Sequence, residues 1–329
     1  MKISIVTLNY NGSEDTIKLL RSLKEQVDQD FEIIVVDNAS EEADFKNLEK
    51  YYTTNQNLWR AALYRNGKNL GFSGGNNVGI RQALHPSTRS PRPEPLGAES
   101  RDEALGTKAG QETGSDWVIL INNDTWVEKD FVERLKAVLG VKRGIVSLPM
   151  NEGDRTCYAG KVKWLSRPHR FHISDLNEAQ KVKDIYAIGG GMVIHKDVFE
   201  KIGFLDEKYF LYFEDIDYSV RARKNNILIE TTNTPVVHHS VSSTTKKLGR
   251  PLILRYHYRN AVYFNLKNGP WYIKLLVWPW SWLIVIKQLG KLVTRRDVEQ
   301  SKAILAGVID FYKNKMGKIK ADVKASNDN

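Results

Sequence analysis

A run of apolar residues stops abruptly at polar ones in the middle of this chain. Residues 117–121 read Trp-Val-Ile-Leu-Ile, and residues 122–125 read Asn-Asn-Asp-Thr. A continuous apolar run of this length is typical of a strand covered on both faces, as in a parallel α/β sheet. Ligands of such sheets bind beyond the carboxyl ends of the strands. Asp124 is therefore in a position to hold a hard divalent cation and a diphosphate, and the competing interpretation is a simple turn and helix cap.

Strands and helices alternate in the predicted secondary structure around this run. Strands are expected at 2–8, 31–36, 60–64, 117–121, 144–148 and 185–195, the last interrupted by three glycines. Helices are expected at 14–26, 45–52, 78–84, 130–139, 198–202 and 218–224, with a glycine-rich turn at 69–77 and an irregular stretch from about 149 to 183. This order predicts an α/β fold with a doubly wound, Rossmann-like and mainly parallel sheet.

The region from His85 to Ser115 breaks this pattern, because it is rich in Pro, Ser, Gly, Arg and Glu and has almost no large apolar residue. We expect residues 86–115 to be a disordered surface insertion. Since this segment leads into the start of the strand at 117–121, it should lie at the amino edge of the sheet, away from a site at the carboxyl edge. We divide the chain into a catalytic domain over residues 1–245 and a helical C-terminal region over residues 246–329.

The positive charge is concentrated in that C-terminal region. The whole chain has a formal net charge of +10, and residues 246–329 carry 17 Lys and Arg against 5 Asp and Glu, which leaves the rest at −2. Helices are expected at 252–266, 271–288 and 298–316; the second has four tryptophans but falls short of the ~20 apolar residues of a membrane span. Its aromatic and basic residues favour an interfacial helix on an anionic membrane surface. The alternatives are a helix packed on the catalytic domain, a homodimer contact or a solvated face.

The single cysteine, Cys157, excludes an internal disulfide and any cysteine-rich metal site, and it fits a reducing compartment. The first residues run straight into a predicted strand, so we expect no signal peptide. These features predict a cytoplasmic protein, held peripherally on the inner face of the cell membrane.

Three of the early strands end in polar segments, at Asn9, Asp37 and Asn122. Because the carboxyl ends of parallel strands share one rim, a crevice there is suited to receive a nucleotide. Asp37 is suited to accept a hydrogen bond from a base or ribose, and Asn9 and Tyr10 to pack along the base. No G-x-G-x-x-G fingerprint follows the first strand, which argues against a nicotinamide-binding fold.

Two further clusters contain groups that do chemistry. Residues 214–217 read Glu-Asp-Ile-Asp, and carboxylates this close repel each other unless a cation, a proton or an arginine compensates them. Such crowding raises a carboxyl pKa and makes a usable general base, whereas the alternative is an acidic first turn of a helix. His238 and His239 are candidate partners for Asp124 in a metal site, or else a structural pair. No zinc-hydrolase, Walker A or G-x-S-x-G pattern is present.

These motifs, taken in order, resemble the inverting family-two glycosyltransferases of GT-A fold, and among them the rhamnosyltransferase-like enzymes of bacterial surface polysaccharide synthesis. The segments that carry the resemblance are 7–12, 35–40, 69–77, 120–125, 189–194 and 210–217, and residues 256–260, Tyr-His-Tyr-Arg-Asn, add to it. The match covers roughly residues 1–265 without the insertion. Six motifs in the right order are far more specific than any one of them.

The resemblance implies a role for each matching position. Asp37 would recognise a uracil or thymine base in a pocket lined by Thr7, Asn9 and Tyr10, with Asn76 and Asn123 also at the nucleotide. Asp124 would end the D-x-D metal motif for Mg²⁺ or Mn²⁺, with His238 as second ligand and His239 as its alternative. Asn122 stands where the first Asp often is, which weakens the expected metal affinity. Asp215 would be the catalytic base and Glu214 the second choice.

The expected reaction moves a sugar, with rhamnose as the first guess, from a nucleoside-diphosphate donor to a saccharide or lipid-linked acceptor. One alternative is a sugar-phosphate nucleotidyltransferase, but residues 7–13 lack a basic phosphate loop. A second is a non-catalytic scaffold that binds nucleotide sugar or membrane. Nucleic-acid binding by the tail ranks low, because the aromatic residues there cluster with aliphatic ones rather than with Lys and Arg.

Overall fold

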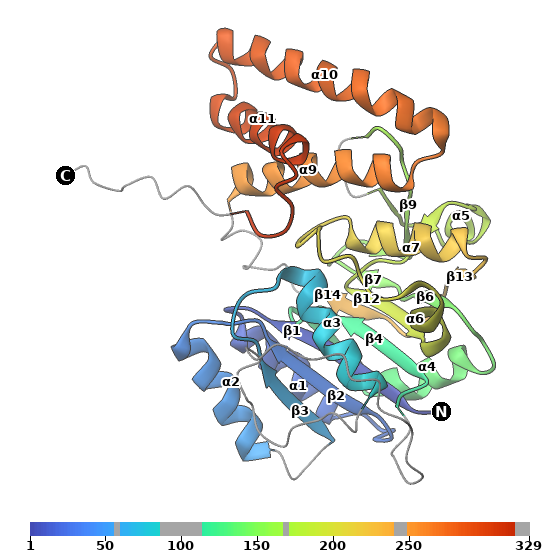
Figure 1. Cartoon of the computed structure of the whole chain (residues 1–329). Helices are drawn as coiled ribbons and strands as arrows, with labels where there is room; N and C mark the ends of the chain where they lie inside the picture. The colour runs from blue at the N-terminus through green and yellow to red at the C-terminus, as the bar shows by residue number, and fades with distance from the viewer. Residues whose placement is uncertain (56–59, 86–113, 167–170, 240–248, 320–329) are drawn as a thin grey trace, which may run out of the picture.

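A seven-stranded sheet forms the centre of the molecule (Figure 1). The computed structural model describes residues 1–55, 60–85, 114–166, 171–239 and 249–319. The strand order is β13-β6-β12-β4-β1-β2-β3, and only β12 runs antiparallel to its neighbours. The strands are β1 (Ile3–Asn9), β2 (Glu32–Asp37), β3 (Ala61–Arg65), β4 (Trp117–Ile121), β6 (Ile145–Ser147), β12 (Gly191–His195) and β13 (Ile229–Thr231). The predicted mainly parallel α/β sheet is therefore confirmed.

Helices cover both faces of this sheet. One face carries α1 (Ser13–Lys24), α2 (Glu42–Asn55) and α4 (Phe131–Leu139), whose apolar residues join one core with Ile3, Ile5 and Ile119. The other face carries α3 (Gly71–Leu84), α6 (Lys196–Ile202) and α7 (Glu214–Lys224), packed over Val6, Val118 and Leu120. Residues that alternate along β1 and β4 thus enter opposite cores, which is why β4 is apolar throughout and β1 has apolar residues on both of its faces.

The glycine-rich segment forms a helix rather than the turn we expected, since α3 already begins at Gly71. Glycine has a low intrinsic helix propensity, so local preference alone points to a turn. Packing overrides that preference: a Cβ on Gly75 would collide with the side chain of Leu8, and one on Gly79 with that of Val6. The glycines therefore let α3 approach β1 closely.

The stretch that looked irregular, residues 149–183, contains short elements. The structure places there β7 (Met150–Asn151), β8 (Thr156–Cys157), β9 (Ala159–Lys161), β10 (His172–Ile173) and α5 (Leu176–Lys181). The four strands among them form two small sheets with three further strands: β5 (Thr125–Val127), β11 (Ile185–Tyr186) and β14 (Val237–His239). The strand order is β5-β14-β7-β8 in one sheet and β10-β9-β11 in the other. Strands of two or three residues give too little periodicity to be recognised in a sequence.

Three helices, α9 (Arg250–Asn268), α10 (Trp271–Val293) and α11 (Val298–Tyr312), form a separate layer above the sheet (Figure 1). They lie where helices were expected, although α10 continues five residues further. Pro279 is accommodated inside α10. Within the described residues, no helix is long and apolar enough to cross a membrane.

The ends of the expected insertion meet at one point. The Ser115 N–H donates to the carbonyl oxygen of Ala83 at 3.0 Å, and a Cβ on Gly114 would collide with the carbonyl of Leu84. Ser115 also contacts Ser4, at the start of β1, so this junction lies at the amino edge of the sheet as expected. Residues 86–113, and the boundary drawn at 245/246, fall outside the described residues.

Candidate active site

A buried hydrogen-bond network joins the carboxyl ends of β1, β2 and β4. The Asn9 amide donates to Asp37 Oδ1 at 2.8 Å and to Ser40 Oγ at 3.1 Å, while its Oδ1 accepts from the Thr16 hydroxyl at 2.8 Å. The Asn123 amide in turn donates to Thr16 Oγ1 at 3.0 Å. Three of the residues we expected at the nucleotide, Asn9, Asp37 and Asn123, are thus brought together on one rim.

The other nucleotide candidates have different surroundings. Thr7 is fully buried and its hydroxyl has no hydrogen-bond partner among the described residues, whereas Tyr10 is partly exposed. Asp37 is also fully buried, and Arg65 Nε lies 3.6 Å from its Oδ2, which compensates its charge. Asn76 does not join the network: it lies on α3, across the sheet from α1, and its amide donates to the Phe72 carbonyl at 2.9 Å.

Asn38 is a rim residue to which the sequence gave no role. Its amide donates to Asn69 Oδ1 and to the Gly71 carbonyl, both at 3.0 Å, and its Oδ1 accepts from the Asn66 amide and the Leu70 N–H. All four partners precede or begin α3. Asn38 therefore fixes the start of α3 against β2, which only the three-dimensional arrangement reveals.

Asp124 faces His239, not His238. His239 Nε2 lies 3.2 Å from Asp124 Oδ2, and both side chains are mostly buried. His238 stacks on Trp126 with ring centroids 4.0 Å apart and lies 3.6 Å from Glu128. The structure thus brings the alternative ligand, His239, and not His238, to Asp124. Successive side chains of a strand point to opposite faces, and the β5–β14 register sets His239 opposite Thr125.

Asp124 and His239 offer an oxygen and a nitrogen ligand at one edge. Mg²⁺ is usually held by one or two carboxylates, with substrate phosphates and waters completing the shell, so a small protein ligand set fits a diphosphate site. Among the described residues, one group of three potential ligands lies elsewhere, at Glu152, Cys157 and His172, with donor atoms within 4.8 Å of one another. That group does not include Asp124.

A glycine loop links Asp215 to the Asp124 segment. The Gly189 N–H donates to Asp215 Oδ2 at 3.3 Å, and the Asn122 N–H donates to the Gly190 carbonyl at 3.4 Å. A side chain on Gly189 would press on Asp215, and one on Gly190 would meet the Asn122 amide and Met150. The loop therefore requires small residues, and two adjacent glycines of it contact Asp215 and the segment that begins at Asn122.

Burial raises the pKa values of two carboxyl groups at the start of α7, Glu214 and Asp215. Desolvation raises the pKa of Asp215 to about 6, against three backbone N–H hydrogen bonds that lower it. Desolvation, with repulsion from Asp215 and Asp217, raises the pKa of Glu214 well above its usual range, and Glu214 Oε2 has no partner among the described residues. Asp215 is partly exposed and Glu214 is buried, so Asp215 is the better placed of the two to meet a substrate.

Asp217, the third carboxylate, is structural. It is fully buried, accepts from Arg221 Nε at 2.8 Å and from the Asn268 amide at 2.6 Å, and lies 2.8 Å from Lys267 Nζ. Arg221, the arginine that follows the acidic cluster in the sequence, therefore neutralises the charge of Asp217. Glu214 and Asp215 keep their raised pKa values because these cations face away from them.

The loop before α7 has a strained backbone. Phe210, Tyr212 and Phe213 have φ angles of 63°, 68° and 77°, a left-handed region that bulky residues rarely adopt. Each such residue costs of order 1–3 kcal/mol and persists only when its surroundings enforce it.

Two buried residues of α9 enforce this loop. The Asn260 amide donates to the carbonyls of Tyr209, Leu211 and Tyr212 at 3.1, 2.8 and 3.0 Å. Arg259 donates to the Tyr209 carbonyl at 3.1 Å and to the Gly317 carbonyl at 2.7 Å, and its burial lowers its pKa to about 10. The sequence placed both residues in a motif without a role, and the structure makes them the support of the Asp215 loop.

Residues 4–86 match the sequence profile described as "Glycosyl transferase family 2". The chain carries a family 2 glycosyltransferase domain. The matched residues contain most of β1 and all of β2, β3 and α3, so they include Asn9 and Asp37 of the rim.

Two characterised relatives of this glycosyltransferase align over most of its length. One is the low-salt glycan biosynthesis hexosyltransferase Agl10 of Haloferax volcanii, 24% identical over 335 residues that cover 96% of this chain and 92% of that protein. The other is the dTDP-rhamnosyl transferase RfbF of Shigella flexneri, 21% identical over 81% of this chain and 80% of that protein.

Solved structures show the fold. The mannosyltransferase PcManGT from Pyrobaculum calidifontis, in complex with GDP-Man and Mn²⁺, has a TM-score of 0.53 at 13% identity, covering 95% of this chain and 87% of that one. Residues 1–349 of S. aureus TarS with UDP-GlcNAc have a TM-score of 0.52 at 13% identity, covering 95% and 92%. The predicted GT-A architecture is confirmed, and the chain is a glycosyltransferase of this fold.

Removing the Asn260 side chain should release the strained loop. In Asn260→Ala the carbonyls of Leu211 and Tyr212 lose this donor, at a cost of roughly 1–3 kcal/mol for each group left unpaired, while the Tyr209 carbonyl keeps Arg259. We expect a clearly lower melting temperature and a fall in turnover. The control is Asn225→Ala, which removes an exposed amide at the end of α7. Equal melting temperatures and turnover for the two variants would refute the role of Asn260.

Proposed function

We propose that this glycosyltransferase transfers its sugar with inversion, using Asp215 as the base and a divalent cation at Asp124 and His239. The observation that carries the proposal is the glycine loop, which contacts Asp215 at Gly189 and the Asp124 segment at Gly190. An inverting displacement needs a base on one side of the sugar and a stabilised leaving group on the other. Two adjacent glycines, Gly189 and Gly190, hold the segments that carry those two groups beside each other.

The residues divide the chemistry between them. Asp124 and His239 would hold Mg²⁺ or Mn²⁺, which neutralises charge on a diphosphate leaving group when bound. Asp215 accepts the proton of the acceptor hydroxyl. At the same time the oxygen of that hydroxyl bonds to the anomeric carbon of the donor sugar, and the bond from this carbon to the diphosphate breaks. Its pKa of about 6 leaves it mostly ionised at neutral pH and still a competent acceptor. Buried, protonated Glu214 adds no second negative charge beside it.

The nucleotide is proposed to lie along the rim. Asp37, positioned by Asn9 and Arg65, is the group offered to the base, and the unpartnered hydroxyl of Thr7 and the partly exposed ring of Tyr10 lie on the same strand end. The relatives favour a hexose donor, and dTDP-rhamnose is the donor we would test first. The proposed acceptor is a saccharide or lipid-linked saccharide of surface polysaccharide synthesis.

We retain residues 1–245 as the catalytic domain.

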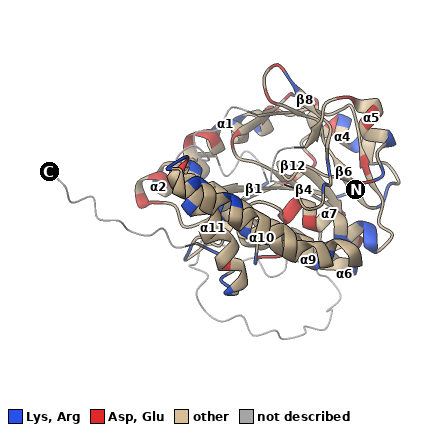
Figure 2. Ribbon diagram, turned by 90° about the horizontal axis from the view of Figure 1, so that it is seen from above, with Lys and Arg blue, Asp and Glu red and all other residues tan. Residues whose placement is uncertain are grey.

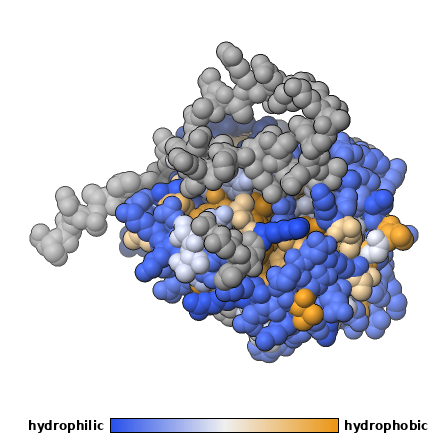
Figure 3. Space-filling view, turned by 90° about the horizontal axis from the view of Figure 1, so that it is seen from below, coloured by the Kyte–Doolittle hydropathy of each residue, from blue (hydrophilic) through white to orange (hydrophobic). Residues whose placement is uncertain are grey.

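The outward face of α10 is proposed to rest on a membrane. Seven exposed apolar residues recur every three or four positions, which forms one stripe along the helix: Trp271, Leu275, Trp278, Trp282, Ile286, Leu289 and Val293. We call these residues the α10 stripe. Figure 2 shows α10 uncharged over most of its length, with basic residues near its C-terminal end, where Lys287, Lys291, Arg295 and Arg296 lie. The opposite side of the molecule is mainly hydrophilic where it can be seen (Figure 3).

This combination suits an interfacial helix on the anionic inner face of the cell membrane. Exposed apolar surfaces of this extent mark membrane or protein contacts. A homodimer built on the α10 stripe is the competing outcome of the same test.

Asp215→Asn should lose turnover and keep its melting temperature, whereas Asp217→Asn should have a lower melting temperature. We expect Asp215→Asn to bind donor normally and lose turnover by about 10²–10⁴-fold, because the base is gone. Because the pKa of Asp215 is raised in the folded state, its carboxyl group stabilises the fold at low pH, and this contribution is lost as the pH rises through about 6. At pH 8 the melting temperature of Asp215→Asn should therefore be no lower than that of the parent. Asp217→Asn should melt lower, since Arg221 and Lys267 lose a buried partner.

The pH profile of the parent enzyme checks the same assignment. The turnover rate should rise with pH up to about 6 and then level off, as Asp215 ionises. Asp184→Asn, an exposed carboxylate near α7, is the control and should leave the profile unchanged. Near-parental turnover of Asp215→Asn would reject Asp215 as the base.

Donor hydrolysis across UDP-, dTDP- and GDP-sugars, with Mn²⁺, Mg²⁺ or EDTA, should identify the donor and the metal ligands. We expect His239→Ala to raise the metal concentration for half-maximal rate by about 10–100-fold, and His238→Ala to change it little. The reverse ranking would remove His239 from the site. Absence of both hydrolysis and calorimetric nucleotide binding would instead support the non-catalytic scaffold.

Flotation with vesicles that contain phosphatidylglycerol should separate membrane docking from dimerisation. The parent should float at low salt, and Trp282→Ser with Ile286→Ser should not, because two strongly exposed members of the α10 stripe are lost. Val141→Ser with Leu228→Ser removes two exposed apolar residues elsewhere and should float like the parent. No flotation of the parent, together with a dimer by sedimentation, would overturn the membrane proposal.

A further inference from the structure

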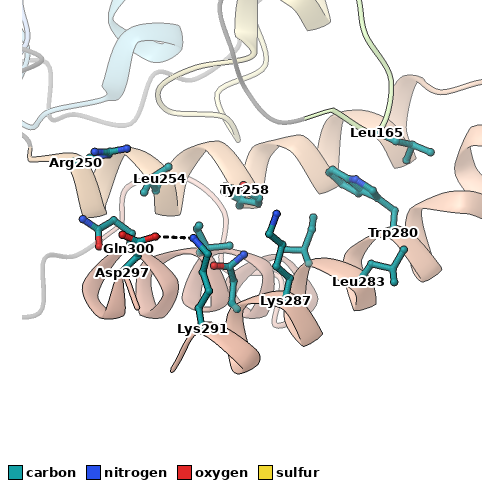
Figure 4. Close-up of a pocket in the computed structure, with 13 residues that line it drawn as sticks. Leu165, Arg250, Leu254, Tyr258, Trp280, Leu283, Lys287, Lys291, Asp297 and Gln300 are labelled. Atoms are coloured by element: carbon teal, nitrogen blue, oxygen red, sulfur yellow. Dashed lines mark hydrogen bonds and ion pairs between the residues drawn. The ribbon is translucent and has the colours of Figure 1, made fainter. Parts of the chain in front are cut away.

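A pocket of about 500 Å³ lies between α9 and α10, closed at one end by the first turn of α11 (Figure 4). Its volume is in the range of small-molecule sites. Side chains of α9, among them Leu254 and Tyr258, face Lys287 and Trp280 of α10 across it. No part of the proposed reaction uses this space.

The pocket is polar at one end and apolar at the other. Arg250, Lys291 and Asp297 gather where α9 and α11 begin, whereas Leu165, Trp280 and Leu283 lie at the opposite end (Figure 4). Such a gradient matches an amphiphile with a polar head and an apolar chain rather than a sugar or a nucleotide.

The polar end has an excess of positive charge. Arg250, Lys287 and Lys291 line the pocket with one carboxylate, Asp297, whose Oδ2 lies 2.7 Å from Lys291 Nζ. Within the described ranges, the side chains of Arg250 and Lys287 make no hydrogen bond or ion pair, although Arg250 contributes, after Lys291, to lowering the pKa of Asp297. The N-termini of α9 and α11 both begin at this end, and helix N-termini carry partial positive charge that favours anions.

The pocket also adjoins the α10 stripe. Leu283 lines the pocket and is 65% exposed beside Trp282 and Ile286. A lipid in the leaflet on which α10 rests would reach the pocket without passing through water.

We propose that this pocket binds one anionic phospholipid of the membrane, with its phosphate at Arg250, Lys287 and Lys291 and one chain against Trp280 and Leu283. This inference rests on the proposed membrane docking of α10. It goes beyond it by assigning a discrete, saturable site with a headgroup preference. Hydrogen bonds to charged groups are worth about 1.5–3 kcal/mol, so each lost cation should weaken binding about tenfold.

The test uses the full-length protein and dioctanoyl phosphatidylglycerol as a dissolved monomer below its micelle concentration. Calorimetry should show saturable binding, much weaker binding of dioctanoyl phosphatidylcholine, and none of glycerol phosphate, which has the head without the chains. Arg250→Gln with Lys287→Gln should lose affinity by at least about tenfold. The matched control is Lys302→Gln with Lys313→Gln, two exposed lysines of α11 and its end that do not line the pocket.

The outcomes separate the pocket from the α10 stripe. Equal binding by the two double variants, equal binding of phosphatidylcholine, or no binding by the parent would overturn the pocket. Glycerol phosphate binding as tightly as the lipid would show a phosphate site without a lipid, and would also overturn it. Flotation of the parent without binding of the short-chain lipid would support membrane docking by α10 and refute the lipid site. Binding of the short-chain lipid without flotation would support the lipid site and refute the docking.

Discussion

The site depends on two buried polar side chains reaching from one helix into a strained loop. Asn260 and Arg259 on α9 donate to the carbonyls of Tyr209, Leu211 and Tyr212, and three aromatic residues of the segment 209–213 hold left-handed backbone angles. A carbonyl that is buried and unpaired is costly, so the loop is stable only while α9 is docked. Through this contact the C-terminal helices become part of the catalytic framework, although they lie in their own layer (Figure 1).

Electrostatics on the two sides of the glycine loop are complementary. On the α7 side, burial keeps the pKa values of Glu214 and Asp215 high, while Asp217 takes the nearby cations. On the rim side, Asp37 and Asp124 each face a cationic or ionisable partner, Arg65 or His239. In the proposed reaction, this arrangement keeps Asp215 as the proton acceptor and leaves Asp37 and Asp124 as fixed partners for ligands.

Local patterns predicted the fold well, and part of the site. The apolar run at β4 and its polar end were recognisable because consecutive residues form both the strand, which is covered on its two faces, and the polar segment that follows it at the rim. The start of α3 at Gly71 was not, because its cause is the approach of Gly75 and Gly79 to β1. His239 rather than His238 faces Asp124 because of a strand register between residues more than a hundred positions apart. The roles of Asn38, Arg259 and Asn260 likewise consist of long-range contacts, for which a single sequence carries no periodic signal.

The junction of Leu84 with Gly114 and Ser115 has a practical consequence. The end of α3 and the residues that lead into β4 meet at one place, at the amino edge of the sheet and away from the rim that carries Asn9 and Asp37. Domain insertion succeeds most often at exposed positions whose two ends lie close together. A fluorescent or affinity module inserted there would give a handle for tethering the enzyme with both its rim and α10 unobstructed.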